Sequence, residues 1–316
     1  MGSTAPNPMV GCVIVVNDQI IAEGYTSPYG GAHAEVNAIQ SVKDVSLLHK
    51  ATLYVTLEPC AHFGKTPPCS DLIIAHKIPR VVIGCVDEHD KVCGKGIAKL
   101  KAAGCEVTVG VLETECKAHH KRFFTYHTKK RPYIILKWAE SNDGFMAPLS
   151  KSETKPVWIS NSYSRQLVHQ WRAEEQAILV GANTVVQDNP SLTTREVEGP
   201  NPTRIVIDPK NSLAETYQVF NSDAKTIRLT SVEIDVQKPL ASEVCNALYI
   251  HQINSVIVEG GQKTLQAFID ENLWDEARIF SSDLKLAKGV SNPQINGTLV
   301  AETSIGSDCL KILTND

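Results

Sequence analysis

One histidine and two cysteines in the first part of the chain have the residue types, and the order, of a zinc site. His33 opens a His-Ala-Glu segment, Cys60 directly follows Pro59, and Cys69 comes later in the sequence. Imidazole nitrogen and thiolate sulfur are preferred zinc ligands, and three protein ligands leave one metal position for water, whereas a structural site would use four. The sequence therefore predicts a catalytic zinc site formed by His33, Cys60 and Cys69.

Glu35 lies two residues after His33 and is the candidate proton carrier of this site. A carboxylate beside a zinc-activated water can take its proton and deliver it to the substrate. We expect His33 and Cys60 each to lie where a helix begins, so that the helix dipole stabilises a thiolate. A helix-capping histidine and core cysteines would explain these residues singly. All four in this order are typical of zinc-dependent nucleobase deaminases.

The gap between the two cysteines is unusually long, since most such sites read Pro-Cys-x-x-Cys or slightly more. Here the segment AHFGKTPP, residues 61–68, separates them. The remaining seven cysteines are predicted to be packing residues. Because no carboxylate or cysteine partners lie near them in sequence, the three histidines His119, His120 and His127 are predicted to be surface residues rather than a second metal site.

Length and composition indicate two globular domains and exclude several classes of protein. The chain has 316 residues, which is long for one core. It lacks a run of eighteen apolar residues and a secretory signal, so no membrane span is expected. Nine cysteines without a repeating framework favour reduced thiols in a cytoplasm. The formal net charge is −4, the second half is acidic and neither half is strongly basic, so nucleic acid is disfavoured as a substrate.

Strand and helix patterns alternate in both halves, which predicts α/β domains. The first half has predicted strands at 10–18, 20–26, 51–59, 81–87 and 105–111, and helices at 33–42, 69–77 and 96–104. The second has strands at 133–139, 177–182, 203–209, 226–230, 255–261 and 278–284, and helices at 161–175 and 263–273. Its strands are expected to be parallel and buried. The predicted domains are 1–129 and 130–316, joined by a solvated Lys-Lys-Arg linker.

Several segments in both halves carry a resemblance to a known family. They are APNPMVGCVIV, GGAHAEVNAI, LYVTLEPCAHFGKTPPCSDLII, VVIGCVDEHDKVCGKGI, LKWAESNDG, VHQWRAEEQAILVGANTVVQDNPSLTTR and VIVEGGQKTL. In them the chain resembles the bifunctional RibD family of riboflavin biosynthesis. The resemblance implies a cytidine-deaminase-like domain that acts as a diaminohydroxyphosphoribosylaminopyrimidine deaminase. It also implies a dihydrofolate-reductase-like domain that acts as a 5-amino-6-(5-phosphoribosylamino)uracil reductase with NADPH. A homo-oligomer is compatible with it.

The resemblance also implies residues that bind a phosphorylated pyrimidine nucleotide. In the first domain they are Asn7, His62, Lys65 and Asp87. Asn7 also fits an Asn-Pro turn. In the second domain they are Arg172, Leu192, Arg195 and Glu259, with Lys137 as the catalytic polar group. Two arginines suit a ribose phosphate, while the alternative for Lys137 is an ordinary strand-edge lysine.

A glycine pair at a strand–helix junction is the visible sign of a cofactor site. No GxGxxG motif follows a strand, but Gly260 and Gly261 stand before a predicted helix, where backbone N–H groups can face a phosphate or form a tight turn. By resemblance, Gly261, Gln262, Lys263, Thr264, Leu265, Gln266 and Ala267 hold NADPH, together with Ala139, Trp158, Thr184 and Asp188.

Two departures from the family leave alternatives open. Family members carry a helix before the Pro-Asn-Pro segment, and here we expect one face of the deaminase sheet to be exposed. The segment 145–157 is longer than usual, so no cofactor contact is assigned in it. One alternative is a nucleic-acid or free-base zinc deaminase with an appended binding domain, which predicts a shorter cysteine gap and a basic groove. The other is a reductase whose deaminase half is inactive.

Overall fold

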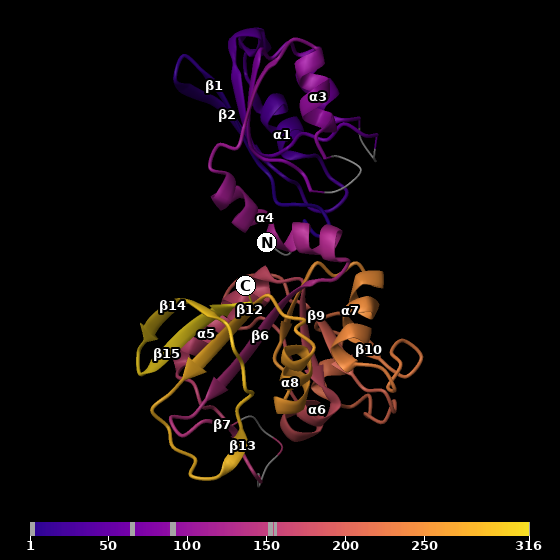
Figure 1. The fold of residues 1–316 in the computed structure, drawn as a ribbon, viewed down its shortest axis with the longest axis vertical. Coiled ribbons are helices and arrows are strands. Elements are labelled where there is room, and N and C mark those ends of the chain that lie inside the picture. Colours follow the sequence, from indigo (N-terminus) through magenta and orange to yellow (C-terminus); the bar gives the residue numbers. More distant parts are fainter. Residues whose placement is uncertain (1–3, 64–66, 89–92, 151–153, 155–156, 316) are drawn as a thin grey trace. The chain divides into compact units, whose positions relative to one another are not determined.

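The chain forms two compact units that divide between Lys130 and Arg131. A computed structural model describes residues 4–63, 67–88, 93–150, 154 and 157–315. Each unit has its own sheet (Figure 1). Within the described residues, we find no helix that is both long and apolar enough to span a membrane.

The first unit is built on a five-stranded sheet with the order β2-β1-β3-β4-β5. The strands are β1 (Gly11–Val16), β2 (Gln19–Tyr25), β3 (Thr52–Leu57), β4 (Arg80–Cys85) and β5 (Glu106–Val109). Strand β1 is antiparallel to both of its neighbours, β2 and β3, whereas β3, β4 and β5 are parallel to one another. Asn17 and Asp18 have positive φ angles of 49° and 60°, which suits the two-residue turn of the β1–β2 hairpin.

Helices pack on this sheet around a continuous apolar core. They are α1 (Ala34–Ser41), α2 (Cys69–Ala75) and α3 (Lys95–Ala102), with a short 3-10 segment at Val45–Lys50, whereas α4 (Glu113–Lys129) packs in a smaller, separate apolar cluster. Ile14, Leu53 and Ile83 lie in this core and are fully buried. Helix α1 approaches β2 closely, because a Cβ atom on Gly24 would lie 2.3 Å from the backbone nitrogen of Ala38. The glycine therefore allows the close helix–sheet contact that places His33.

The Lys-Lys-Arg segment differs from the predicted solvated linker at its last residue. Helix α4 continues to Lys129, and Lys129 and Lys130 are exposed. Arg131 is only 8% exposed, and its guanidinium donates to both carboxylate oxygens of Asp275, at 2.5 and 2.8 Å. The prediction was wrong for Arg131 because a buried carboxylate that is distant in sequence neutralises its charge.

The second unit has an eight-stranded sheet with the order β10-β9-β8-β11-β6-β12-β15-β14. The strands are β6 (Tyr133–Glu140), β8 (Ala177–Gly181), β9 (Thr203–Ile207), β10 (Thr226–Leu229), β11 (Ser255–Val258), β12 (Glu276–Ser281), β14 (Thr298–Ile305) and β15 (Asp308–Thr314). Neighbours from β10 to β12 are parallel, as predicted, but β14 and β15 form an antiparallel hairpin at one edge. The prediction missed this hairpin, whose strand β14 is largely exposed and lacks a buried apolar run.

Four helices and a short two-stranded ribbon complete the described part of the second unit, whose buried apolar residues form two clusters. The helices are α5 (Ser162–Glu174), α6 (Ala182–Asp188), α7 (Leu240–Ile250) and α8 (Gln262–Asp270), with a 3-10 turn at Gln218–Phe220. A separate ribbon pairs β7 (Phe145–Pro148) with β13 (Gly289–Ser291). Strands β8 and β11 are neighbours and parallel, so their carboxyl ends and the helices that follow them lie at the same edge of the sheet. Glu259 and Gly260 come directly after β11 and therefore lie at this edge.

Candidate active sites

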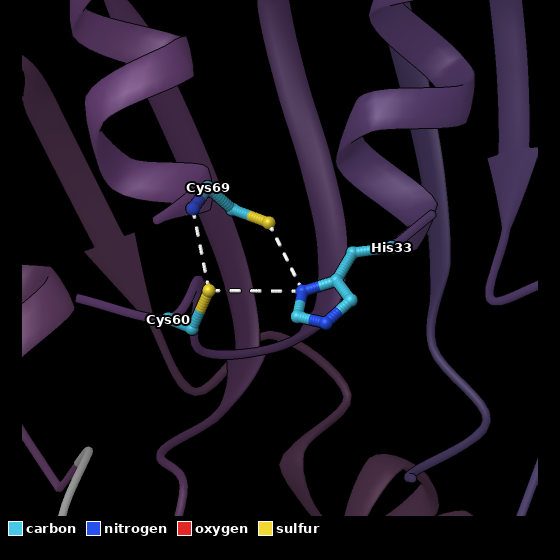
Figure 2. A group of neighbouring side chains, drawn as sticks. All are labelled: His33, Cys60 and Cys69. Atoms are coloured by element: carbon cyan, nitrogen blue, oxygen red, sulfur yellow. Dashed lines mark hydrogen bonds between the residues drawn. The ribbon is translucent and has the colours of Figure 1, made fainter. Parts of the chain in front are cut away.

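The three predicted zinc ligands lie together in the first unit, although they come from three separate segments (Figure 2). His33 is the N-cap of α1, Cys60 lies in the loop after β3, and Cys69 is the first residue of α2. Nδ1 of His33 is 3.2 Å from Sγ of Cys69 and 3.6 Å from Sγ of Cys60. Tetrahedral zinc with ordinary Zn–N and Zn–S bonds separates its ligands by about 3.6 Å. The donor set and its spacing therefore fit a zinc ion with one open position.

The prediction that Cys60 begins a helix was wrong, because α2 begins at Cys69. The electrostatic effect nevertheless reaches Cys60, since the backbone N–H of Cys69 donates to Sγ of Cys60 at 3.2 Å. The hydrogen bond from the Cys69 side chain is the main cause that lowers the pKa of Cys60, and the same coupling raises the pKa of Cys69. This shift favours the thiolate form of Cys60, which is the form that binds zinc.

Glu35 lies in the first turn of α1 and is only 4% exposed. Burial raises its pKa to about 7, and the nearby Cys60 charge adds to this rise. A bound zinc cation would oppose the rise. A buried carboxylate with this tuning can take up and release a proton near neutral pH.

The predicted substrate residues of the first unit occupy different environments. The backbone N–H of Asn7 donates to the carbonyl of Thr4 at 2.9 Å in a turn, and His62 is exposed. Asp87 is buried just beyond β4, where its backbone N–H donates to Oε2 of Glu58 at 3.3 Å. Lys65 lies outside the described residues. The structure thus joins Asp87 to the segment that carries Cys60.

Two buried polar side chains in this unit were not expected from the sequence. His120 is 2% exposed and its Nε2 is 3.2 Å from Oγ1 of Thr56, so the surface prediction was wrong for this histidine. Burial lowers the pKa of His120 to about 4. Glu58 is 4% exposed, and its only sequence signal is its place in Leu-Glu-Pro-Cys, directly before a zinc ligand. Each of these buried side chains has its hydrogen-bond partner on an element that is distant in sequence.

Three predicted residues of the second unit meet in one partly buried charge cluster. Lys137 lies on β6, Glu259 follows β11, and Arg172 lies on α5. Arg172 donates to Oε2 of Glu259 at 2.8 Å, and Nζ of Lys137 is 3.8 Å from Oε1 of the same carboxylate. Burial lowers the pKa of Lys137. Burial alone would raise the pKa of Glu259, but the positive charges of Arg172 and Lys137 outweigh it and lower that pKa.

The loop that contains Leu192 and Arg195 contacts this cluster. Arg172 donates to the carbonyl of Thr193 at 3.3 Å, and Arg195 donates to the hydroxyls of Ser191 and of Thr193, the latter at 3.0 Å. Leu192 is buried with a positive φ of 54°. The sequence did not single out His169, whose Nδ1 accepts the backbone N–H of Arg195 at 3.1 Å.

The predicted cofactor residues gather in part around two helix N-termini. The backbone N–H of Gly261, the N-cap of α8, donates to Oγ1 of Thr184 on α6 at 3.0 Å. A Cβ atom on Gly260 would lie 2.7 Å from the backbone nitrogen of Gly181, so the two strand ends approach closely. Gly261 is exposed, which leaves a polar, open helix start of the kind that binds phosphate.

The other predicted cofactor residues differ in exposure. Leu265 is fully buried in the core, so a cofactor could reach only its backbone, and Thr264 is 9% exposed. Trp158 is 58% exposed, with the Arg165 guanidinium 4.9 Å from its ring centre. Lys263 is exposed, and the remaining members, Ala139, Asp188, Gln262, Gln266 and Ala267, are partly buried.

Comparisons with known protein families agree with this division of the chain. Residues 1–85 match the cytidine and deoxycytidylate deaminase zinc-binding region, and residues 132–286 match the RibD C-terminal domain. Fold and sites together define a two-domain enzyme in which a zinc-dependent deaminase is joined to a reductase.

Full-length relatives identify the family. The riboflavin biosynthesis protein RibD of Aquifex aeolicus is 40% identical over 92% of this chain and 85% of its own length. The crystal structure of a diaminohydroxyphosphoribosylaminopyrimidine deaminase/5-amino-6-(5-phosphoribosylamino)uracil reductase from Thermotoga maritima superposes with a TM-score of 0.90, at 38% identity over 99% of this chain and 94% of that one. RibD of Acinetobacter baumannii gives a TM-score of 0.87 at 31% identity, over 99% of this chain and 93% of that one.

The chain belongs to the RibD family of bifunctional riboflavin biosynthesis enzymes. The predicted α/β fold class is confirmed, with a cytidine-deaminase-like domain followed by a RibD C-terminal domain. The family match and the donor set both support zinc as the metal of the first domain. The alternative of a nucleic-acid deaminase with an appended binding domain is not favoured.

Proposed function

We propose that the first domain deaminates a diaminohydroxyphosphoribosylaminopyrimidine and that the second reduces the resulting 5-amino-6-(5-phosphoribosylamino)uracil. These are the two activities named for the Thermotoga maritima relative. The observation that carries the proposal is the presence, in one chain, of a three-residue cluster that could hold zinc and a separate, partly buried Lys137–Glu259–Arg172 cluster. One cluster suits hydrolysis, and the other suits binding and reduction of a phosphorylated sugar.

In the deaminase domain, Glu35 is the group that moves protons. When bound, zinc supplies a water molecule of lowered pKa. Glu35 takes a proton from that water as its oxygen bonds to the amino-bearing ring carbon, and delivers protons to the ring and to the leaving amine. The carbon–nitrogen bond then breaks and ammonia leaves. The buried position of Glu35 beside His33 and Cys60 supports this role.

In the reductase domain, Lys137 and Glu259 flank the reacting sugar. When bound, NADPH would supply a hydride for C1 of the open-chain imine form of the sugar. Lys137 provides the proton that the imine nitrogen takes up, so that the ribosyl group becomes a ribityl group. The lowered pKa of Lys137 makes its ammonium a better proton donor near neutral pH. Glu259 holds Lys137 and Arg172 in place.

Charged side chains in both domains recognise the same class of substrate. Arg172 and Arg195 offer guanidinium groups to the ribose phosphate, and the buried Leu192 shapes the loop between them. In the deaminase domain we assign substrate binding to Asn7, His62, Lys65 and Asp87. The NADPH phosphates are assigned to the open N-terminus of α8 at Gly261, beside Thr184.

The test is to incubate the purified, zinc-loaded chain with the diaminopyrimidine nucleotide, with and without NADPH. Ammonia release should not require NADPH, whereas NADPH oxidation should follow deamination. A coupled ammonia assay and the absorbance of NADPH measure the two steps. The order of the two signals distinguishes a bifunctional enzyme from a lone reductase.

Two outcomes would contradict the proposal. Absence of ammonia from zinc-loaded protein would remove the deaminase assignment. Absence of NADPH oxidation with substrate that is already deaminated would remove the reductase assignment.

We also assign the enzyme to the cytoplasm, and the free-thiol state of all nine cysteines supports a reducing compartment.

A further inference from the structure

Glu58 forms an unusually complete set of hydrogen bonds next to the zinc ligands. It follows β3 and directly precedes Pro59 and Cys60, and it is 4% exposed. Oε2 accepts the backbone N–H groups of Asp87 at 3.3 Å and Gly94 at 2.9 Å, while Oε1 accepts those of Gly96 at 2.9 Å and Ile97 at 3.2 Å. An ionised carboxylate offers about four acceptor positions, so these four bonds use its capacity.

The bonds place Glu58 at the N-terminus of α3. Gly94 is the N-cap of this helix, and Gly96 and Ile97 belong to its first turn. The first backbone N–H groups of a helix lack partners within the helix, and the helix dipole favours a negative charge there. The carboxylate therefore caps α3 from a different element and also holds the backbone beyond β4 at Asp87.

The segment after Glu58 is pressed against the same helix. A Cβ atom on Gly96 would lie 2.0 Å from the carbonyl oxygen of Pro59, which leaves no room for a side chain. On its other side, Cys60 is attached to α2: its carbonyl accepts the N–H of Ser70 at 3.1 Å, and its Sγ accepts the N–H of Cys69. Cys60 is thus held between two helix N-termini, directly on one side and through Glu58 and Pro59 on the other.

We propose that Glu58 is a positioning residue of the zinc centre. Its carboxylate fixes Pro59 and Cys60 against α3, which keeps the Cys60 thiolate within ligand distance of His33 and Cys69. Through its bond to the backbone of Asp87, it also links the Cys60 segment to a residue that we assign to substrate binding. This inference rests on the zinc site of the proposed function. Groups that orient metal ligands typically affect metal affinity by 10- to 100-fold when they are replaced.

The test is the full-length Glu58→Gln variant. The amide turns an NH2 group towards backbone N–H groups that need an acceptor, so two of the four bonds are lost. We expect the dissociation constant for zinc, measured by competition with a chromogenic chelator, to rise by about 10- to 100-fold. Deamination should return at high zinc concentration. In the cobalt(II)-substituted protein, the ligand-field bands should shift because Cys60 is displaced.

Matched controls separate positioning from general stability. Glu106→Gln removes a carboxylate from the exposed start of β5 in the same domain and should leave zinc affinity unchanged. Glu35→Gln should lose deamination but keep the cobalt(II) spectrum. The reductase turnover of each variant shows whether its second domain is still folded and active. If Glu58→Gln does not fold, Glu58→Asp, which keeps the charge with a shorter reach, should still weaken zinc binding.

Unchanged zinc affinity and an unchanged cobalt(II) spectrum in a folded Glu58 variant would overturn the inference and leave the proposed function intact. Failure of the unmodified chain to bind zinc would instead overturn the proposed function, and the inference with it. A loss of thermal stability in Glu58→Gln with normal zinc affinity would also overturn it, because Glu58 would then serve only the fold.

Discussion

At the scale of single residues, neighbouring charges decide what a buried glutamate does. Glu35 is buried and Glu259 is partly buried, yet their pKa values shift in opposite directions. Burial dominates at Glu35 and raises its pKa to about 7, whereas Arg172 and Lys137 lower the pKa of Glu259 despite its burial. The first glutamate is therefore suited to carry a proton, and the second to remain a fixed anion.

Glu35→Gln tests the first of these roles. The amide has nearly the same shape but cannot exchange a proton, so we expect ammonia release to fall by about 100- to 10,000-fold. Zinc content, measured by metal analysis, should be unchanged, because Glu35 is not among the ligands. NADPH oxidation with deaminated substrate serves as the control. Deamination at the original rate would show that another group carries the proton.

His169 gives the reductase domain a predictable dependence on pH. Burial, with the charges of Arg172 and Arg195, lowers its pKa to about 4, while Glu196 and Glu259 oppose this effect. An unfolded histidine has a pKa of about 6.5, so between these values the unfolded state binds more protons. Stability from His169 is fully present above about pH 6.5 and is lost as the pH falls towards 4, by at most about 1.4 kcal/mol per pH unit.

We therefore expect His169→Asn to flatten this dependence, because asparagine cannot titrate although its oxygen can still accept the N–H of Arg195. Urea unfolding at pH 7 and pH 5 measures it. The chain has four tryptophans, all in the second half (Trp138, Trp158, Trp171 and Trp274), so their fluorescence reports the reductase domain. Equal pH dependence in both proteins would contradict the prediction.

At the scale of elements, both sites depend on close approaches of backbone to backbone. Gly24 lets α1 reach the sheet, Gly96 lets α3 reach Pro59, and Gly260 lets the end of β11 reach the end of β8. At each position a side chain would collide with main-chain atoms, which cannot rotate away as a side chain can. These glycines therefore set the distances between the elements that carry site residues.

Gly260→Ala tests this at the cofactor edge, with Gly181→Ala as the matched control. The new methyl at 260 would meet backbone atoms of Gly181 and Val180 at 2.7 and 2.8 Å, whereas at 181 the nearest atom is the Thr264 hydroxyl at 3.0 Å. We expect Gly260→Ala to reduce the free energy of unfolding by about 1–3 kcal/mol and to weaken NADPH binding. Gly181→Ala should cost less, because a hydroxyl can rotate. Chemical denaturation and NADPH titration give the comparison, and equal costs would contradict it.

At the scale of the whole molecule, each unit contains its own sheet, core and candidate site. The zinc ligands lie in residues 33–69, and the Lys137–Glu259–Arg172 cluster lies wholly within the second unit. The cores of the two sheets also consist of separate sets of residues. The two chemical steps should therefore respond independently to changes confined to one unit.

Removal of the metal tests this independence. In the described part of the chain, His33, Cys60 and Cys69 form the one cluster that could hold a metal ion. We expect a strong zinc chelator to reduce ammonia release by at least about 100-fold, because the water then loses its activation. NADPH oxidation with deaminated substrate should change by less than about twofold. Added zinc should restore ammonia release, and a parallel loss of both activities would contradict the separation.

The sequence by itself was sufficient for the three residues of the candidate metal cluster, the α/β class, most strands and helices, and the family. Zinc ligands are recognisable because few residue types bind the metal and because their order along the chain is characteristic. Strands such as β8 and β11 are recognisable because buried parallel strands are short apolar runs. The β14–β15 hairpin was missed because its exposed strand carries no such run.

Only the tertiary structure revealed the groups whose role depends on partners that are distant in sequence. Glu58 looks like any glutamate until four backbone N–H groups from beyond β4 and from α3 surround its carboxylate. The buried position of His120 beside Thr56 and the ion pair of Arg131 with Asp275 likewise depend on partners that are distant in sequence. In the sequence, residue types and short spacings indicate which reactions the protein could catalyse. Burial and charge, which depend on what the fold brings together, decide which side chains carry it out.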